Sequence, residues 1–560
     1  MAYANLLFVK ERPLLICMIC GALVGVVIAL AVLDPQFIAG TGGKWVRPEN
    51  DYIAYLVAWN YYIIDEWRFP LFNVPAMGYP EGGSVLFNDA LPITAIATKI
   101  LYQWTGTRVN PFGWWIFLTY VLQGAMAARV VCAVGVRSIC ACAAAALLAI
   151  VNASFLARMG HTALSSHFLL LWVLALYFES VRRERARIPE FVAVLAIALL
   201  VNAYLFAMVF AFELVTLLAL VVRGQLRPRD SAAIAAGMAL VIAVGAVAGY
   251  GMVLVNPSAM RSEGFGLYSW NVAGLMLPPE GFFGFLAGLP RYGTHGQYEG
   301  EAYIGRGALL LLLLCVVSNP KNVVQLAGRY RLYVAALAAL AIYAASNVVY
   351  AGNVLLIHYY VPQLAIDLGN YFRATGRFIW PLAYSLAILP VACIFKWWRP
   401  VPAIAVAVVA VTLQVDEGRP GLRYRRTLTT QAYDDLIDAP RIQSWLAQHE
   451  RLFQYPSWAC GGLAGPDRRW ASPEANRELQ LQLEAARAGL PTNSVYTSRI
   501  LKDCRVEAGW LEGPALEPGV LYVIAPHAVR GSPTLAGLAR SPACVTLDWA
   551  VVCSRTWPGH

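Results

Sequence analysis

Eleven long apolar stretches occupy most of residues 1–415, and they constrain the fold more than any other feature of the sequence. A helix needs about 20 apolar residues to cross the hydrocarbon core of a membrane. The chain is 59% hydrophobic and 14% charged, whereas soluble proteins carry about 25% charged residues. This composition excludes a soluble globular protein and a disordered one. The predicted spans are 13–33, 111–133, 138–157, 164–181, 190–204, 205–223, 231–254, 303–319, 331–349, 376–395 and 400–415.

The formal net charge of +10 has two explanations, nucleic-acid binding or an excess of positive charge in cytoplasmic loops. With the N-terminus inside, the inner loops contain Arg137; Arg182, Arg183, Arg185 and Arg187; Arg223, Arg227 and Arg229; Lys321 and Arg329; and Lys396 and Arg399. This pattern favours the second explanation. We therefore predict a cytoplasmic N-terminus and no nucleic-acid partner. The segments predicted to lie outside are 34–110, 255–302, 350–375 and 416–560.

Two apolar stretches need a separate interpretation. Residues 90–104 (ALPITAIATKILYQW) are short for a span and contain Lys99. We interpret them as a helix on the membrane surface, because a span here would reverse the orientation of every later loop. The first stretch is followed by Leu33-Asp34-Pro35 without a small-residue cleavage site, which favours a retained anchor over a signal peptide.

The charge density changes near Asp416. Residues 1–415 carry 27 Lys+Arg and 18 Asp+Glu, about 11% of positions, whereas residues 416–560 carry 16 and 15, about 21%. The second density is close to that of a soluble domain. We predict a polytopic α-helical membrane module over 1–415 and an extracytoplasmic α/β or α+β domain over 416–560. The helix-like stretches in this tail are 439–449 and 474–489, and the strand-like stretches are 519–525 and 544–552.

The eleven cysteines fall into two groups. Seven lie in apolar stretches or at their ends, where buried thiols are common. The other four, Cys460, Cys504, Cys544 and Cys553, lie in the tail. An even number in an oxidising compartment predicts two disulfides. Three pairings are possible, and the most local joins Cys460 to Cys504 and Cys544 to Cys553.

Asp51 and Asp89 are the acidic residues that most deserve a functional interpretation. Asp51 precedes Tyr52-Ile-Ala-Tyr-Leu-Val-Ala-Trp, which can form an amphipathic helix, and Asp89 precedes the stretch at 90–104. Aspartate before a helix is commonly an N-cap, which stabilises it by about 1 kcal/mol. Alternatively, one carboxylate takes a proton from an acceptor hydroxyl while the other positions that carboxylate or holds a metal ion. The sequence leaves both interpretations open.

Arg373 and Arg377 are four residues apart, at the outer end of the 376–395 span. On a helix they would share one face. Arginine presents a rigid fork of donors that suits phosphate oxygens. The alternative is a contact with lipid head groups at the membrane edge. A lipid phosphate and a structural anchor are therefore both compatible with this pair.

Four further polar residues lie in or near the predicted outer loops. His161 follows Arg158, and it is either a phosphate contact or a hydrogen-bonded surface residue. His167 begins an apolar stretch and is expected to be a packed polar contact. Glu299 and Glu301 lie in a glycine-rich segment, and they are either contacts for an acceptor or part of a solvated turn.

The order of these features resembles the GT-C glycosyltransferases. A single span is followed by an acidic residue in a long outer loop, by many spans and by an extracytoplasmic tail, and Asp51 matches the family's first-loop general base. Asp89-Ala90-Leu91-Pro92 resembles its second acidic site, with one proline where some families have two. The segments that resemble a bacterial branch of this superfamily are 67–71 (WRFPL), 160–167 (GHTALSSH), 296–303 (GQYEGEAY) and 372–378 (FRATGRF).

The resemblance implies a reaction class and no particular sugar. The donor would be a sugar on a polyprenyl phosphate, transferred with inversion to a glycan, a lipid-linked saccharide or a protein. Arg373, Arg377 and His161 would hold the phosphate, while Glu299 and Glu301 would contact the acceptor. Mg²⁺ or Mn²⁺ is the cation that the acids would hold, although they do not decide whether a metal is needed. The expected location is the bacterial inner membrane, with a periplasmic tail.

The second class of function is a transporter or translocase of lipid-linked sugars. Such a protein needs ionisable groups within its spans and broken helices in paired halves. Glu213 is the clearest charge within a predicted span, and the sequence shows no internal repeat. The polar groups gather at the predicted outer face instead, which favours an enzyme.

Overall fold

The computed structural model describes residues 13–41, 45, 51–158, 160–255, 261–279, 286, 288–465, 472–499, 502–513 and 515–557. The chain forms two compact units. The first, which we call the helical unit, comprises Met1–Ile38, Phe112–Val244 and Arg261–Thr430. The second, which we call the mixed unit, comprises Ala39–Pro111, Gly245–Met260 and Gln431–His560.

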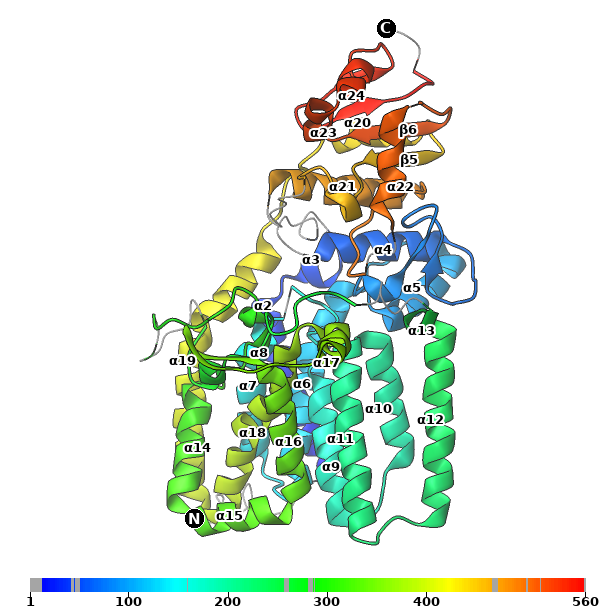
Figure 1. The fold of residues 1–560 in the computed structure, drawn as a ribbon. Helices are drawn as coiled ribbons and strands as arrows, with labels where there is room; N and C mark the ends of the chain where they lie inside the picture. Colours follow the sequence, from blue (N-terminus) through cyan, green and yellow to red (C-terminus); the bar gives the residue numbers. More distant parts are fainter. Residues whose placement is uncertain are drawn as a thin grey trace. The chain divides into compact units, whose positions relative to one another are not determined.

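The helical unit contains long helices that run in similar directions (Figure 1). They are α2 (Leu14–Val32), α6 (Phe112–Ala133), α7 (Ile139–Ile150), α9 (Phe168–Arg183), α10 (Ile188–Val201), α11 (Ala203–Val222), α12 (Pro228–Ala248), α14 (Arg306–Ser318), α16 (Arg331–Ala345), α18 (Trp380–Trp397) and α19 (Pro400–Thr430). Between α14 and α16, α15 (Pro320–Arg329) runs across this direction. Shorter helices are α3 (Pro35–Ile38), α8 (Ala153–Leu156) and α17 (Gln363–Gly369). An antiparallel hairpin pairs β3 (Val348–Ala351) with β4 (Val354–His358).

Each of the eleven predicted spans contains helix, but only some helices are long enough to cross a membrane. Six described helices meet that requirement, or seven if α14 and α15, which are bent by 100°, form one span. α7 has 12 residues and α10 has 14. A helix rises about 1.5 Å per residue, so these two are shorter than the hydrocarbon core, which is about 30 Å thick. The structure therefore supports a polytopic membrane protein, and eleven full crossings remain a prediction.

Small residues bring α2 and α6 into close contact. A Cβ atom on Gly21 would lie 2.2 Å from the Gly124 carbonyl oxygen, and one on Gly25 would lie 2.3 Å from the Tyr120 carbonyl oxygen. Larger side chains at these positions would push the helices apart. Close approach through small residues is the usual way in which helices pack inside membranes.

The mixed unit combines a four-stranded sheet with helices from the loop and the tail. The sheet order is β5 (Arg451–Tyr455), β6 (Val520–Ile524), β8 (Val551–Cys553) and β7 (Cys544–Thr546). β5 and β6 are parallel and the other two pairings are antiparallel. All five residues of β6 are buried, which makes it the central strand of the core.

The remaining elements of the mixed unit are mostly short. They are α4 (Tyr52–Ile64), α5 (Pro92–Thr105), α13 (Met252–Val255), α20 (Ala439–Leu446), α21 (Pro473–Ala488), α22 (Cys504–Ala508), α23 (Pro526–Gly531), α24 (Pro533–Leu538) and the pair β1 (Asn73–Val74) and β2 (Gly83–Ser84). Disulfides join Cys460 to Cys504 and Cys544 to Cys553. This confirms the most local of the three pairings.

The boundary predicted at 415/416 falls inside α19, which continues to Thr430. Glu417 is 1% exposed and accepts hydrogen bonds from the Tyr303 hydroxyl at 2.5 Å and the Arg306 backbone at 2.7 Å. These contacts tie the first charged residues after 415 to the helical unit. Conversely, the first loop packs with the tail, since the Tyr61 hydroxyl donates to the Leu490 carbonyl at 2.6 Å.

Candidate functional site

Asp51 stands at the start of α4, but its side chain does not cap the helix. Its backbone angles are helical (φ −70°, ψ −4°), and it makes no side-chain capping hydrogen bond. Instead, its Oδ1 atom accepts a hydrogen bond from the Tyr496 hydroxyl at 3.2 Å. The capping interpretation therefore does not describe Asp51. The helix also differs from a surface helix, because residues 52–63 are all buried.

Asp89 lies in a strained turn between a short 3-10 helix (Val85–Phe87) and α5. Asp89 has φ of 50° and Leu91 has φ of 49°. Residues with side chains rarely adopt positive φ, and each such residue costs about 1–3 kcal/mol. Strain of this kind is concentrated at functional sites. Aspartate tolerates positive φ better than leucine does, so Leu91, two positions after Asp89, is the strained residue of this turn.

Asp51 and Asp89 both act electrostatically on the buried hydroxyl of Tyr55. Tyr55 lies one helical turn after Asp51 and is 2% exposed. Burial, followed by the charges of Asp51 and Asp89, raises the pKa of Tyr55 well above its usual value. Burial and then the charge of Asp89 also raise the pKa of Tyr250. The structure therefore brings Asp51 and Asp89 into one cluster of tyrosines within the mixed unit.

A loop of the tail, residues 493–499, completes this cluster. The Asn88 side chain donates to the Tyr496 carbonyl. The Phe87 carbonyl accepts hydrogen bonds from the Ser498 backbone at 2.8 Å and from its hydroxyl at 2.7 Å. The Tyr496 ring packs against Trp458, with centroids 4.9 Å apart. These contacts hold Tyr496 against the loop that carries Asp89.

A cavity lies beside the cluster, between the first loop and the tail. It encloses about 490 Å³ of space, part of it open to solvent. Its lining includes Glu81, Ser84 and Phe87 from the loop and Thr497 and Arg499 from the tail. Phe87 and Thr497 are adjacent in sequence to residues of the cluster. The cavity therefore offers polar groups of both charges, while Asp51 and Asp89 are not among the residues that line it.

The helical unit contains a second polar site, centred on Glu299. Its Oε2 atom pairs with Arg158 at 2.5 Å and with Arg377 at 3.0 Å. Burial alone would raise the pKa of Glu299, but Arg377 and Arg158 outweigh this effect and hold the pKa well below its usual value. The charge of His161 acts in the same direction. Two guanidinium groups around one carboxylate leave a net positive charge.

Arg158 is the residue of this site that the sequence interpretation missed. It is 2% exposed, and its Nη2 donates to the Tyr298 carbonyl at 2.9 Å. Its buried Nε has no hydrogen-bond partner among the described residues. The only signal in the sequence was a charge at the end of an apolar stretch, next to His161.

The remaining candidates have specific partners. Arg373 donates to the Ser262 hydroxyl at 3.0 Å and lies 5.0 Å from the Tyr268 ring centroid, and its segment forms 3-10 turns rather than the α-helix considered above. Glu301 is 5% exposed and pairs with Arg291. Burial of Glu299 and Glu301 excludes a solvated turn.

His167 is fully buried. Its Nδ1 lies 2.7 Å from the Tyr384 hydroxyl, and its ring lies 4.2 Å from that of Trp380. It is the packed polar contact that was expected.

No acidic site for a metal ion is evident among the described residues. Asp51 and Asp89 do not join a third acidic, histidine or cysteine side chain there in a group that could hold an ion. Mg²⁺ is often held by one or two carboxylates together with substrate phosphates. Two aspartates are the number of carboxylates that such a site uses.

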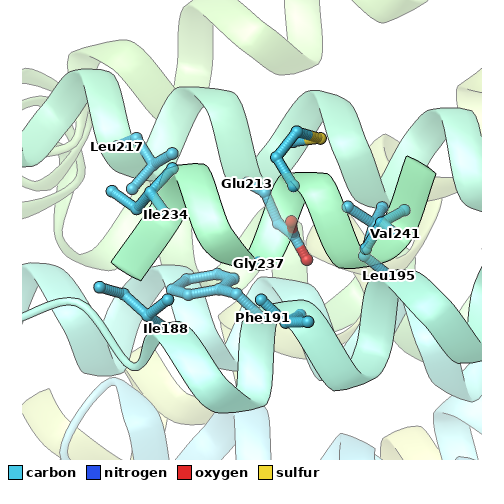
Figure 2. Close-up of a pocket in the computed structure, with 10 residues that line it drawn as sticks. Ile188, Phe191, Leu195, Glu213, Leu217, Ile234, Gly237 and Val241 are labelled. Atoms are coloured by element: carbon cyan, nitrogen blue, oxygen red, sulfur yellow. The ribbon is translucent and has the colours of Figure 1, made fainter. Parts of the chain in front are cut away.

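A small apolar pocket lies between α10, α11 and α12 (Figure 2). The Glu213 side chain points into it, toward Phe191 and Leu195. Glu213 is 7% exposed, and its Oε1 has no hydrogen-bond partner among the described residues. An ionisable group inside a membrane is expensive and often belongs to a transport path.

The candidate spans indicate a membrane protein, and in its mixed unit the first loop and the tail share one acidic cluster. The chain belongs to the family described as "Domain of unknown function (DUF6311)", which matches residues 22–418. The C-terminal domain of the same family matches residues 441–555. No curated protein matches the sequence.

One solved structure with a detectable likeness is the archaeal oligosaccharyltransferase AglB from Archaeoglobus fulgidus, in complex with an inhibitory peptide and a dolichol-phosphate. The identity is 12% and the TM-score is 0.39. The match covers 86% of this chain and 64% of that chain, so this chain spans less than two thirds of that protein. A TM-score this low does not establish a common fold.

Proposed function

We propose that this protein is a membrane glycosyltransferase that transfers a sugar from a polyprenyl-phosphate donor to an extracytoplasmic acceptor. The acceptor is a glycan, a lipid-linked saccharide or a protein. The proposal rests on the contacts of the Asp51 carboxylate. This carboxylate makes no capping hydrogen bond to α4 and accepts a hydrogen bond from the Tyr496 hydroxyl. The sequence resemblance to GT-C enzymes gives the same residue the role of general base.

In the proposed reaction, Asp51 takes the proton of an acceptor hydroxyl. The acceptor oxygen forms a bond to the anomeric carbon, and the bond from that carbon to the phosphate oxygen breaks. The electron pair leaves with the polyprenyl phosphate, and attack from the opposite face inverts the configuration. Asp89 would orient Asp51, or would help to hold Mg²⁺ or Mn²⁺, and such an ion would supply positive charge to the leaving group.

The donor phosphate is assigned to the positive site of the helical unit. Arg158 and Arg377 share one carboxylate and keep a net positive charge, and His161 lies close enough to add to it. Fixed cations stabilise a leaving phosphate without having to reorganise. Arg373 is proposed as an outer contact, and Glu301 as a support for the 291–303 segment through its pair with Arg291.

The proposed location is the bacterial inner membrane, with a cytoplasmic N-terminus and a periplasmic tail. The positive charge of the short inner loops supports this orientation. The two tail disulfides support it as well, because disulfides persist in an oxidising compartment.

The decisive experiment replaces Asp51 with Asn in the full-length protein. A deletion strain is complemented with wild type or Asp51→Asn, and intact masses of polyprenyl-phosphate sugars and envelope glycans are measured. We expect the deletion to accumulate donor and lack product, and Asp51→Asn to restore less than a hundredth of wild-type transfer. Glu66→Gln is the matched control, because Glu66 is an exposed acid of the same loop outside both sites. If folded Asp51→Asn retains more than a tenth of transfer, the assignment of the base is wrong.

Glu213 favours a second candidate, a translocase of lipid-linked sugars without chemistry. Its buried Oε1, which has no hydrogen-bond partner in the described part of the chain and lies at the pocket of Figure 2, is the kind of group that transport requires. Purified protein in liposomes would then move a lipid-linked sugar across the bilayer without changing its mass, and Glu213→Gln would abolish this movement. Transfer activity that is unchanged in Glu213→Gln would support the enzyme instead.

A further inference from the structure

Five of the seven cysteines outside the tail lie on three helices of the helical unit that pack against one another. They are Cys17 and Cys20 on α2, Cys132 on α6, and Cys140 and Cys142 on α7. The sulfur atoms of Cys17, Cys132 and Cys142 all lie within 4.8 Å of one another. The exposed fractions of these three residues are 0%, 6% and 0%. Three helices therefore direct one buried thiol each toward a common point.

Helix packing alone does not explain this convergence. Cys17, Gly21 and Gly25 are spaced by four residues and share one face of α2. Gly21 and Gly25 provide the close contact with α6, and alanine or glycine in place of the cysteines would allow the same approach. By contrast, Cys315 and Cys393 form only a pair on α14 and α18.

The sulfur positions match the size of a metal site. Cys132 and Cys142 have sulfur atoms 3.9 Å apart. The centre of an equilateral triangle with 3.9 Å sides lies about 2.3 Å from each corner, which is the length of a metal–thiolate bond. No pair exceeds 4.8 Å, so the other two sulfur–sulfur distances are at most 0.9 Å longer than the side of such a triangle. The three sulfur atoms are therefore close enough to share a single ion.

The donor set selects the ion. Thiolates prefer soft cations such as Cu(I) and Zn²⁺. A structural Zn²⁺ site has four ligands, and no fourth acidic, histidine or cysteine ligand joins the three thiols among the described residues. We therefore propose that Cys17, Cys132 and Cys142 bind one Cu(I) ion through three thiolates. On binding, three S–H bonds lose their protons to solvent and three Cu–S bonds form, without oxidation or reduction.

Nearby residues fit this assignment. Positive charge next to the site offsets the charge of the thiolates: Arg182 donates to the Ala133 carbonyl at 2.6 Å, and Arg137 acts electrostatically on Cys132. Cys20 and Cys140 are half-buried and interact with each other, and Cys20 also acts on Cys17. These two thiols therefore lie beside the buried trio and are less buried than it is. The site is separate from both polar sites of the proposed enzyme.

The test measures copper binding by the full-length protein in detergent. Protein with intact tail disulfides is titrated anaerobically with Cu(I) against a chromophoric Cu(I) chelator, and retained copper is counted by mass spectrometry. We expect one Cu(I) per chain in wild type and at least a tenfold weaker affinity in Cys142→Ser and Cys132→Ser. Cys315→Ser is the matched control and should bind like wild type, because it removes a buried thiol from the two-thiol pair.

X-ray absorption on the copper-loaded wild type keeps the proposal testable if the variants fail to fold. Three Cu–S bonds of about 2.3 Å are expected. Two sulfur neighbours or coordination by oxygen would overturn the proposal, as would wild type that loses all copper to the chelator. Equal binding by folded Cys142→Ser and wild type would also overturn it, and so would tighter retention of Zn²⁺ than of Cu(I).

Discussion

Replacing Tyr496 with Phe tests whether the tail takes part in the reaction. The substitution removes the hydroxyl that donates to Asp51 at 3.2 Å and keeps the ring that packs against Trp458. A hydrogen bond to a charged group contributes about 1.5–3 kcal/mol. The distance is longer than the usual ~2.8 Å for O–H···O, so we take the lower end of that range. In the proposed role, this hydrogen bond orients the Asp51 carboxylate toward the acceptor, and we expect its loss to raise the activation free energy by about 1.5 kcal/mol, a roughly tenfold lower kcat.

The assay is transfer from a purified lipid-linked donor, with kcat and KM measured separately. We expect kcat to fall about tenfold while KM changes less than twofold. Tyr61→Phe is the control, because its hydroxyl also joins α4 to the tail, at 2.6 Å from the Leu490 carbonyl, but does not touch a carboxylate. In an Asp51→Asn background, Tyr496→Phe should have no further effect. Unchanged kcat in Tyr496→Phe, or an equal loss in that background, would refute the reasoning.

Three further predictions concern stability. Glu299→Gln leaves two buried arginines without their carboxylate and should lower the free energy of unfolding by about 3–5 kcal/mol. Because the pKa of Glu299 is depressed in the folded state, wild type should lose stability as the pH falls below about 4.3, and melting curves from pH 7 to 3 should be flatter for Glu299→Gln. Burial lowers the pKa of Lys99 to about 8, so the free energy of unfolding should increase as the pH rises from about 8 to 10.4. Lys99→Met should abolish this increase, as measured by the melting temperature at each pH. The disulfide Cys460–Cys504 closes a sequence separation of 44 residues and should contribute about 4 kcal/mol to the free energy of unfolding. Cys544–Cys553 closes a separation of 9 residues and should contribute about 3 kcal/mol. Equal losses of melting temperature in the two Cys→Ser double variants would contradict this loop-length argument.

The sequence predicted the helices well and their lengths less well, for a local reason. Apolar runs reveal helices wherever they occur, but polar caps inside the runs divide them. Asn152 accepts a hydrogen bond from the Ser154 backbone at 3.0 Å and starts α8. Asn202 likewise accepts one from Tyr204 at 2.9 Å and separates α10 from α11. The end of the helical unit was harder to predict, because charge density does not reveal that Glu417 is paired inside this unit.

The candidate sites show what a single sequence can reveal. Asp51 and Asp89 were identifiable because each precedes a helix in a long loop. Tyr496 lies 445 residues from Asp51, and no pattern connects the two. Glu299 was identifiable as polar, but only its burial between Arg158 and Arg377 distinguishes an ion-pair centre from a solvated turn. Contacts between residues distant in sequence decide these roles, and the sequence does not encode them locally.

The pairing of Asp51 with Tyr496 has a consequence for how the protein is made. Ribosomes add about 5–20 residues per second, so 445 residues take about 20–90 s. Throughout that interval the nascent chain holds the Asp51 helix without the tail that later covers it. The acidic cluster is therefore assembled last, after nearly the whole chain has been synthesised. Premature termination between the last candidate span, which ends at Thr430, and residue 496 would leave every candidate span in place and remove Tyr496 from the cluster.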